Sequence, residues 1–239
     1  MAQLFLRSYD GNISTLHFSE GASPKDALKL VVSTKACSPN PSLITIDAQR
    51  QILYCTRNDR ETFTGRLQLF SVKNAGILEE KSSVSAPFGA AYHTLSNRGN
   101  ALAVAYYYAG RVGIYDVEDT RQIKTAQELD FPNFVPGPGR DQDISRPHQA
   151  ILDPSGSQVL VTDLGAGLIR LFTVGSPHQV QEVGGFDFPK GSFPRHVAVV
   201  TLRDRTQLYV LIEPGYQHNF NLHGRASRRR YLVNAQKRR

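Results

Sequence analysis

The sequence contains no tryptophan, a single methionine and only two cysteines, Cys37 and Cys55. Two cysteines are too few for the disulfide framework that holds small secreted domains together. Because cysteine is among the residue types most often buried in proteins, we expect two free, buried thiols, with one bridge as the alternative. Apolar packing must then stabilise the fold, and ten tyrosines and twelve phenylalanines supply large side chains for it.

Long hydrophobic runs are also missing. No stretch approaches the ~20 apolar residues that a membrane span requires. The N-terminus passes directly into Leu4–Leu6, without the basic segment and apolar core of a signal peptide. We therefore expect a cytoplasmic protein that has no membrane partner.

Acidic residues are lacking from one segment only. Residues 225–239 contain seven of the 28 lysines and arginines and no Asp or Glu, so the rest of the chain is electrically balanced. The net charge of +7 therefore describes a tail and not a binding face, and we expect no nucleic-acid partner. Nuclear targeting or RNA contact by Arg228–Arg230 is the alternative to a solvated tail.

Helical periodicity is weak throughout the chain. The best candidate helix, Ala22–Lys29, is short, whereas segments such as Leu168–Val174 alternate with the period of a strand. The 19 glycines and 13 prolines are spread along the chain and predict many turns. These patterns predict an all-β protein built from short strands.

The strands recur in units of about 50 residues, the repeat length of propeller blades. Equivalent first strands are 49 and then 57 residues apart. Matched segments close the first strands at Ile46–Asp47, Leu95–Ser96 and Leu152–Asp153, form the second strands at Ile52–Cys55, Ala101–Val104 and Val159–Val161, and end the third strands at Leu69–Val72, Ile114–Val117 and Leu171–Val174. This recurrence predicts a β-propeller. An unrelated β-sandwich would explain the short strands but not the matched turns.

The repeat also predicts the domain organisation. We expect one incomplete propeller over residues 1–216 and a basic tail over 217–239 that is disordered or non-native. The propeller comprises a part-blade at 2–34, blades at about 43–90, 91–145 and 146–193, and the start of another blade at 194–216. The part-blade has expected strands at Gln3–Arg7, Ile13–Phe18 and Leu28–Ser33. Phe131–Ser145 lacks alternation and is expected to be a long loop, of the kind that covers sites.

One set of motifs resembles a known family. Pro147–Gly156, Asp163–Gly165, Pro194–His196 and Tyr209–Glu213 are similar, in this order, to motifs of the seven-bladed propeller lactonases. That family includes the propeller-type 6-phosphogluconolactonases and the fungal carboxy-cis,cis-muconate cyclases. Gly137–Arg140 resembles the family's loop before the histidine. The resemblance extends from near residue 2 to about Glu213 and implies that His148, Arg195 and Glu213 belong to the site.

The chain departs from the family pattern in several places. Arg146 stands where a second histidine is frequent, Phe193 where a glycine precedes Pro-Arg-His, and Gly167 where an acidic residue follows Asp-Leu-Gly. Seven blades of about 50 residues need roughly 350 residues, so we expect about four to five blades. The change to basic sequence without strand pattern after Glu213 is interpreted as truncation, by a shifted frame, a retained intron or a partial gene model.

The register of the repeat independently brings candidate site residues together. His148 and His196 each begin the first strand of adjacent units, which places both near the same rim. Asp163 and Glu213 end the second strands of those units 50 residues apart, on what should be the same face, and Arg195 lies beside them. We predict His148, Arg195 and Glu213 as catalytic and His196, Asp163 and Arg146 as substrate-binding. For Asp163 the alternative is a structural role in capping the Leu164–Gly165 turn.

An earlier unit contains further candidates. His93 and the run Tyr106–Tyr108 occupy comparable places, but a tyrosine run in a strand is interpreted as packing.

These residue types suit the opening of a sugar-acid lactone by water. Glu213 or His148 would activate the water, and Arg195 would stabilise the oxyanion or bind a substrate carboxylate or phosphate. A muconate cyclase-type isomerase would use the same groups, and a non-catalytic propeller that acts as a binding module is a third interpretation. None of these requires a cofactor, and no His, Cys and Asp set has the spacing of metal ligands. The expected partner is a small-molecule lactone or organic acid.

Overall fold

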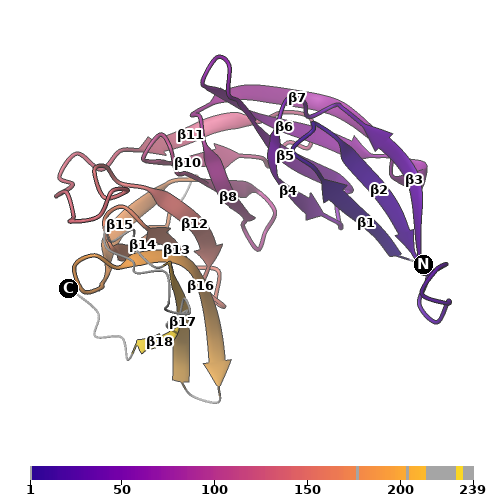
Figure 1. The fold of residues 1–239 in the computed structure, drawn as a ribbon. Coiled ribbons are helices and arrows are strands. Elements are labelled where there is room, and N and C mark those ends of the chain that lie inside the picture. The colour runs from indigo at the N-terminus through magenta and orange to yellow at the C-terminus, as the bar shows by residue number, and fades with distance from the viewer. Residues whose placement is uncertain (1, 176–177, 203–204, 214–229, 234–239) are drawn as a thin grey trace, which may run out of the picture. The chain divides into compact units, whose positions relative to one another are not determined.

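The computed structural model describes residues 2–175, 178–202, 205–213 and 230–233 (Figure 1). These residues form five β-sheets, each built from strands that follow one another in the sequence. Within the described residues there is no α-helix, only the 3₁₀ turn η1 (Asn74–Gly76), and no helix capable of spanning a membrane. The all-β prediction is confirmed, and the candidate helix Ala22–Lys29 was wrong because its last two residues begin a strand.

The strands of the first two sheets are as follows. The first sheet holds β1 (Ala2–Arg7), β2 (Ile13–Phe18) and β3 (Leu28–Thr34), and the second holds β4 (Pro41–Asp47), β5 (Ile52–Asp59), β6 (Thr64–Val72) and β7 (Leu78–Ala86). Both sheets belong to a compact unit formed by Met1–Ala90 and Asp116–Lys124.

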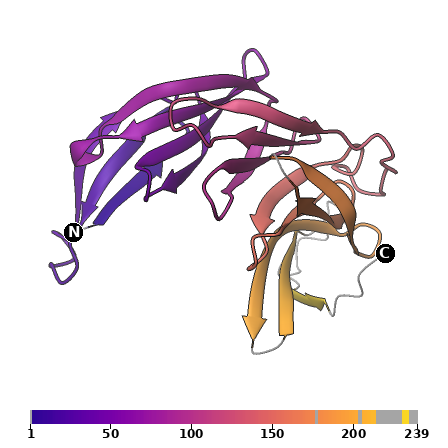
Figure 2. The same cartoon turned by 180° about the vertical axis from the view of Figure 1, so that it is seen from behind.

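The remaining sheets belong to a second unit, formed by Ala91–Tyr115 and Thr125–Arg239. They hold β8 (Ala90–Leu95), β9 (Ala101–Tyr106), β10 (Arg111–Asp116) and β11 (Lys124–Leu129); β12 (Pro147–Leu152), β13 (Gln158–Asp163), β14 (Leu168–Val174) and β15 (Val180–Asp187); and β16 (Phe193–Leu202), β17 (Arg205–Glu213) and β18 (Arg230–Val233). The orange strands β16 and β17 lie side by side in both views (Figures 1 and 2).

The core of the second unit follows from the alternation of β13. Val159 and Val161 pack in one cluster with side chains of β9 and β10, whereas Leu160 packs in another with Val197 and Leu208. Successive side chains of a strand point to opposite faces, so this strand contributes to two cores. A nearly continuous apolar run is the expected sequence for a strand covered on both faces.

The Asp-Pro-Ser-Gly turn joins β12 to β13. Asp153 accepts hydrogen bonds from the backbone N–H groups of Ser155 and Gln158 at 3.1 and 2.8 Å. Gly156 has φ of 71°, and a Cβ there would lie 2.2 Å from the Asn97 side chain. Glycine is therefore required both by its backbone conformation and by the close approach of Asn97.

Each complete sheet has a fourth strand that the repeat did not predict. In the second sheet this strand is β7, whose sequence LEEKSSVSA has no apolar alternation and no fully buried residue. Outer strands of this kind are exposed, so hydrophobic periodicity does not reveal them.

The predicted basic tail also contains structure. Arg230–Val233 forms β18 and pairs with β17, with Leu208 opposite Val233. The sequence pattern after Glu213 did not predict this strand. Residues 217–229 and 234–239 of the predicted tail lie outside the described residues.

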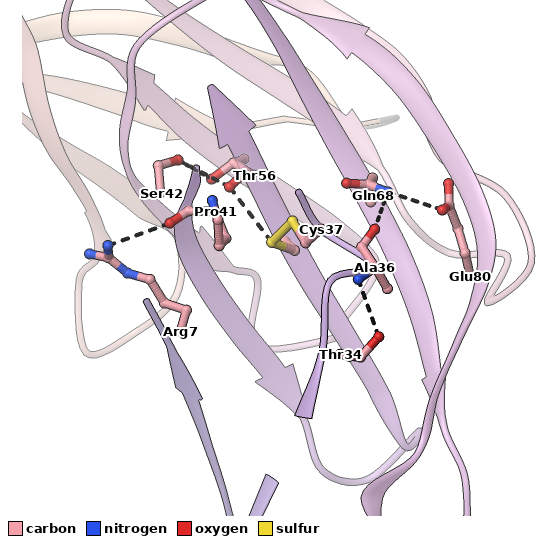
Figure 3. Close-up of a disulfide and its surroundings, with 10 residues drawn as sticks. Arg7, Thr34, Ala36, Cys37, Pro41, Ser42, Thr56, Gln68 and Glu80 are labelled. Carbon is pink, nitrogen blue, oxygen red and sulfur yellow. Dashed lines mark hydrogen bonds between the residues drawn. A yellow bond between two sulfur atoms is a disulfide. The ribbon is translucent and has the colours of Figure 1, made fainter. Parts of the chain in front are cut away.

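Cys37 and Cys55 form a disulfide (Figure 3), so the expectation of free thiols was wrong although both residues are fully buried as predicted. Cys55 lies in β5, and Cys37 lies between β3 and β4. The Gln68 amide donates hydrogen bonds to the Ala36 carbonyl at 3.2 Å and to Glu80 at 3.0 Å. Covalent and polar contacts thus anchor the connection between two sheets of the first unit.

We expect removal of this disulfide to lower the free energy of unfolding by about 3 kcal/mol, because it closes a loop in the unfolded chain. Its cysteines are 18 positions apart. The measurement is urea unfolding of the Cys37→Ala/Cys55→Ala double variant against the oxidised wild type. Reduced wild type serves as the control, since it keeps both sulfur atoms and should lose comparable stability. An unchanged midpoint in both samples would contradict the prediction.

Candidate functional site

Two adjacent sheets of the second unit carry equivalent β-bulges at the start of their first strands. In β12 the extra residue between Pro147 and Gln149 is His148, and in β16 the extra residue between Pro194 and His196 is Arg195. A bulge leaves one residue without a ladder partner and re-aims its side chain. The sequence thus presents His148 and Arg195 at matching positions. The expected match between His148 and His196 was therefore wrong by one residue.

The two bulge residues contact each other. The Nε of Arg195 donates a hydrogen bond to Nε2 of His148 at 2.9 Å, and Nε of Arg195 lies 3.8 Å from a carboxylate oxygen of Glu213. The side chains of Arg195 and Glu213 are 43% and 46% exposed. Within the described residues, the other nitrogens of the guanidinium donate no hydrogen bond. A ligand can therefore reach both charged groups.

Buried polar residues fix the backbone of Arg195. The Thr162 hydroxyl donates a hydrogen bond to the Arg195 carbonyl at 2.8 Å and accepts one from the Gln149 N–H at 3.0 Å. The Gln149 side-chain oxygen accepts from the Val197 N–H at 2.6 Å. Thr162 is fully buried and Gln149 is nearly so. These bonds hold one sheet in register against the next, and so set the position of Arg195 relative to His148.

His148 is held as a neutral imidazole. Burial, the Arg195 charge and the neighbouring His196 lower the pKa of His148 to about 3. Since Nε2 accepts the bond from Arg195, the proton of the neutral ring is assigned to Nδ1, which is buried and finds no partner among the described residues. The His196 ring lies 4.9 Å from the His148 ring, edge to face, and burial with Arg195 lowers the pKa of His196 too.

The low pKa of His148 predicts a loss of stability in mild acid. Between about pH 6.5 and pH 3, His148 is protonated in the unfolded chain but stays neutral in the native protein. The free energy of unfolding therefore falls as the pH decreases through this range. The contribution is about 1 kcal/mol per pH unit. In His148→Gln, the amide oxygen can still accept from Arg195 but does not titrate. Unfolding free energies at pH 7.5, 6.5, 5.5 and 4.5 should therefore fall more steeply for the wild type, and parallel curves would contradict this prediction.

Asp163 does not share a face with Glu213. Counted from the bulges, Asp163 pairs with Pro147 as Ile212 pairs with Pro194, so Glu213 comes one residue later in its strand. Successive side chains of a strand point to opposite faces of the sheet. Glu213 therefore points to the face opposite the one that corresponds to Asp163. The expectation of a common face was therefore wrong.

Asp163 is fully buried in a polar cluster instead. It accepts hydrogen bonds from the Ser145 hydroxyl, from the backbone N–H groups of Arg146 and Ala166 at 2.7 and 3.0 Å, and from the Arg170 guanidinium at 2.9 Å. The bond to Ala166 caps the turn after β13, which is the structural alternative for this residue. Arg170 also bonds Glu182 at 3.1 Å and lies 3.8 Å above the Phe131 ring. The cluster anchors both ends of the loop before His148.

Arg146 and Tyr107 lie on the other side of His148. The Arg146 guanidinium bonds Asp143 at 2.7 Å and lies 5.2 Å above the Tyr107 ring. The Tyr107 ring contacts the His148 ring edge to face, with centroids 5.7 Å apart. From the sequence, Tyr107 was interpreted as a packing residue. Its position directly after a strand is the one sequence signal for its contact with His148. Tyr106 fits the packing interpretation, because it is buried and hydrogen-bonded to Tyr115, whereas His93 is buried within β8.

With this geometry in place, comparison with known proteins identifies the family. A family model described as "Lactonase, 7-bladed beta-propeller" matches residues 5–217. The chain belongs to this lactonase family.

An individual relative agrees with the family match. A curated protein named "Probable 6-phosphogluconolactonase" from Arthroderma benhamiae is 25% identical over 210 residues, which cover 87% of this chain and 52% of the relative. The chain thus spans about half the length of that protein.

Solved structures show the same fold at low identity. The periplasmic gluconolactonase PpgL of Pseudomonas aeruginosa has a TM-score of 0.67 and 19% identity, over 94% of this chain and 63% of its own. A protein from Lactobacillus plantarum has a TM-score of 0.69 and 19% identity, over 84% and 55% of the two chains. The sheets of this chain are therefore those of a partial propeller.

One departure of this chain from the family pattern has a structural counterpart. Phe193, where the pattern has glycine, is buried, and a Cβ on Gly139 would lie 2.2 Å from its ring. Gly139 belongs to the loop before His148, and Gln142 of that loop donates to the Ser192 carbonyl at 3.0 Å. The bulky phenylalanine thus packs against the loop exactly where the loop has no side chain.

Proposed function

We propose that the protein hydrolyses a sugar-acid lactone at the site formed by His148, Arg195 and Glu213. The observation that carries the proposal is the half-exposed guanidinium of Arg195, held by a neutral His148 and placed beside the Glu213 carboxylate. A fixed cation beside a carboxylate supplies the two groups that ester hydrolysis needs, an oxyanion stabiliser and a base.

In this mechanism Glu213 accepts a proton from water while the water oxygen attacks the lactone carbonyl. The tetrahedral oxyanion is stabilised by the nitrogens of Arg195 that donate to no described residue. The ring C–O bond then breaks, and the leaving oxygen takes the proton from Glu213. The product is the open hydroxy acid, with water fully accounted for.

His148 serves in this proposal as a positioning residue rather than as the base. Its Nε2 already accepts the bond from Arg195, and its pKa of about 3 makes it a weak base at neutral pH. Holding Nε of Arg195 leaves the remaining nitrogens free to face the ligand. Of the two bases that the sequence suggested, the arrangement therefore favours Glu213.

The proposed partner is a small lactone with an anionic or polyhydroxylated body, as sugar-acid lactones have. His196 lies against His148 and is proposed to contact the substrate. Arg146, which lies over the Tyr107 ring, is also proposed to interact with the substrate. We propose a structural role for Asp163, since all its bonds are internal. Cytoplasmic localisation stays a prediction, and the Cys37–Cys55 disulfide favours an oxidising compartment.

The proposal is tested with the purified chain and two lactones, 6-phosphoglucono-δ-lactone and glucono-δ-lactone. We expect hydrolysis of at least one of them above the spontaneous rate, followed by proton release. Absence of catalysis with both would remove the proposed reaction and favour a binding module.

A further inference from the structure

The three consecutive tyrosines at the end of β9, Tyr106–Tyr108, place their hydroxyl groups in different surroundings. The hydroxyl of Tyr106 bonds that of Tyr115 at 2.6 Å in the core. Tyr108 is 59% exposed. Tyr107 lies between these extremes, half-buried, and its hydroxyl makes no hydrogen bond with any residue that the structure describes. A phenol that finds no partner in its own protein is available to a ligand.

Contacts on several sides fix the Tyr107 ring. The rings of His148 and Tyr108 meet it edge to face at 5.7 and 5.1 Å, and Arg146 covers it at 5.2 Å. Arg146 is itself held by Asp143. The hydroxyl of Tyr107 is therefore presented in one direction at little cost in side-chain entropy on binding.

The surroundings of the Tyr107 hydroxyl keep it protonated. Burial is the main cause that raises the pKa of Tyr107 to about 12, and the negative charges of Asp141 and Glu213 raise it further, against Arg146. The group is therefore protonated at neutral pH. It is a neutral donor and acceptor on a ring that contacts His148 of the proposed site.

We propose that Tyr107 is a substrate-binding residue whose phenol hydrogen-bonds a hydroxyl group of a polyhydroxylated lactone held at the His148–Arg195–Glu213 site. The inference rests on the proposed function and adds a determinant of specificity to it. Arg195 faces the carbonyl, so the phenol meets another part of the ligand. A phenol both donates and accepts, as does each hydroxyl of a sugar acid.

The test compares Tyr107→Phe with Tyr108→Phe, which loses an exposed hydroxyl from the adjacent residue. With glucono-δ-lactone as substrate, Tyr107→Phe should raise KM about three- to tenfold, the effect of one hydrogen bond. The kcat should stay within about twofold, because the bond is equally present in the ground state and the transition state. Tyr108→Phe should match the wild type, and all three proteins should share one melting temperature.

An unchanged KM in Tyr107→Phe would overturn the inference, as would a fall in kcat alone, which would place the phenol at the reacting carbonyl. Calorimetric titration with D-gluconate separates this inference from the proposed reaction. If the wild type binds gluconate but hydrolyses no lactone, weaker binding by Tyr107→Phe supports the binding role while the reaction fails. If the wild type neither binds gluconate nor hydrolyses the lactone, both proposals fall.

Discussion

Replacing Arg195 with methionine is expected to lower kcat/KM for lactone hydrolysis by about 10²- to 10³-fold, the usual effect of removing one oxyanion donor. Methionine retains most of the side-chain length but neither the charge nor the hydrogen bond to His148. Because Arg195 is 43% exposed, its loss leaves no buried charge without a partner, and the melting temperature should hardly change. A large loss of rate at constant stability is the signature of a group that acts on the reaction.

Two further variants sharpen this expectation. Arg195→Lys keeps the positive charge but not the planar group that bonds His148 through one nitrogen and a ligand through others, so an intermediate rate is expected. Arg121→Met is the matched control, since Arg121 is 83% exposed and lies in the other compact unit. Full activity of Arg195→Met would remove Arg195, and with it the proposed mechanism, from consideration.

Replacing Asp163 with asparagine should lower the free energy of unfolding by about 3 kcal/mol. This is the usual loss of stability when one partner of a buried ion pair is removed. Asparagine has nearly the same volume but no charge, and its NH₂ group cannot accept the bonds that a carboxylate oxygen accepts. Arg170, only 9% exposed, would keep Glu182 as its sole carboxylate partner. Urea unfolding at neutral pH measures the change.

Asp143→Asn provides the matched control for this prediction. Asp143 also pairs with an arginine, Arg146, but its side chain is 61% exposed. Exposed ion pairs contribute at most about 1 kcal/mol, so this variant should unfold almost as the wild type does. Equal losses of unfolding free energy in the two variants would contradict the prediction, because they would show that burial does not add to the stabilising effect of the Asp163 ion pair.

Periodicity allowed much of the fold to be predicted, and its failures have a common cause. Residue spacing located the buried strands because their apolar runs recur in phase. It missed β7, whose exposed residues carry no such pattern, and β18, which lies in a basic segment. The Cys37–Cys55 pairing depends on where a loop returns to β5, which spacing alone does not determine.

The side chains that meet around Arg195 were named from the sequence, but the register that brings them together was not. The sequence was aligned on its histidines, which matched His148 with His196 and Asp163 with Glu213, whereas the bulges align Pro147 with Pro194 and shift both matches by one residue. In the structure Arg195 occupies the position equivalent to His148, and Ile212 the position equivalent to Asp163. The contact of Tyr107 with His148 was not predicted, because adjacent tyrosines look alike in a sequence, whereas their hydroxyl groups differ in surroundings.

The bulge after proline also occurs in β4, where the extra residue between Pro41 and Leu43 is Ser42. Three sheets of the chain therefore have a bulge residue directly after a proline in their first strand. This residue is Ser42, His148 or Arg195. Each of these residues is free of the strand ladder, so exchanging it leaves the neighbouring backbone pairing intact. Evolution, or an engineer, can change the chemistry of such a protein one sheet at a time without redesigning any sheet.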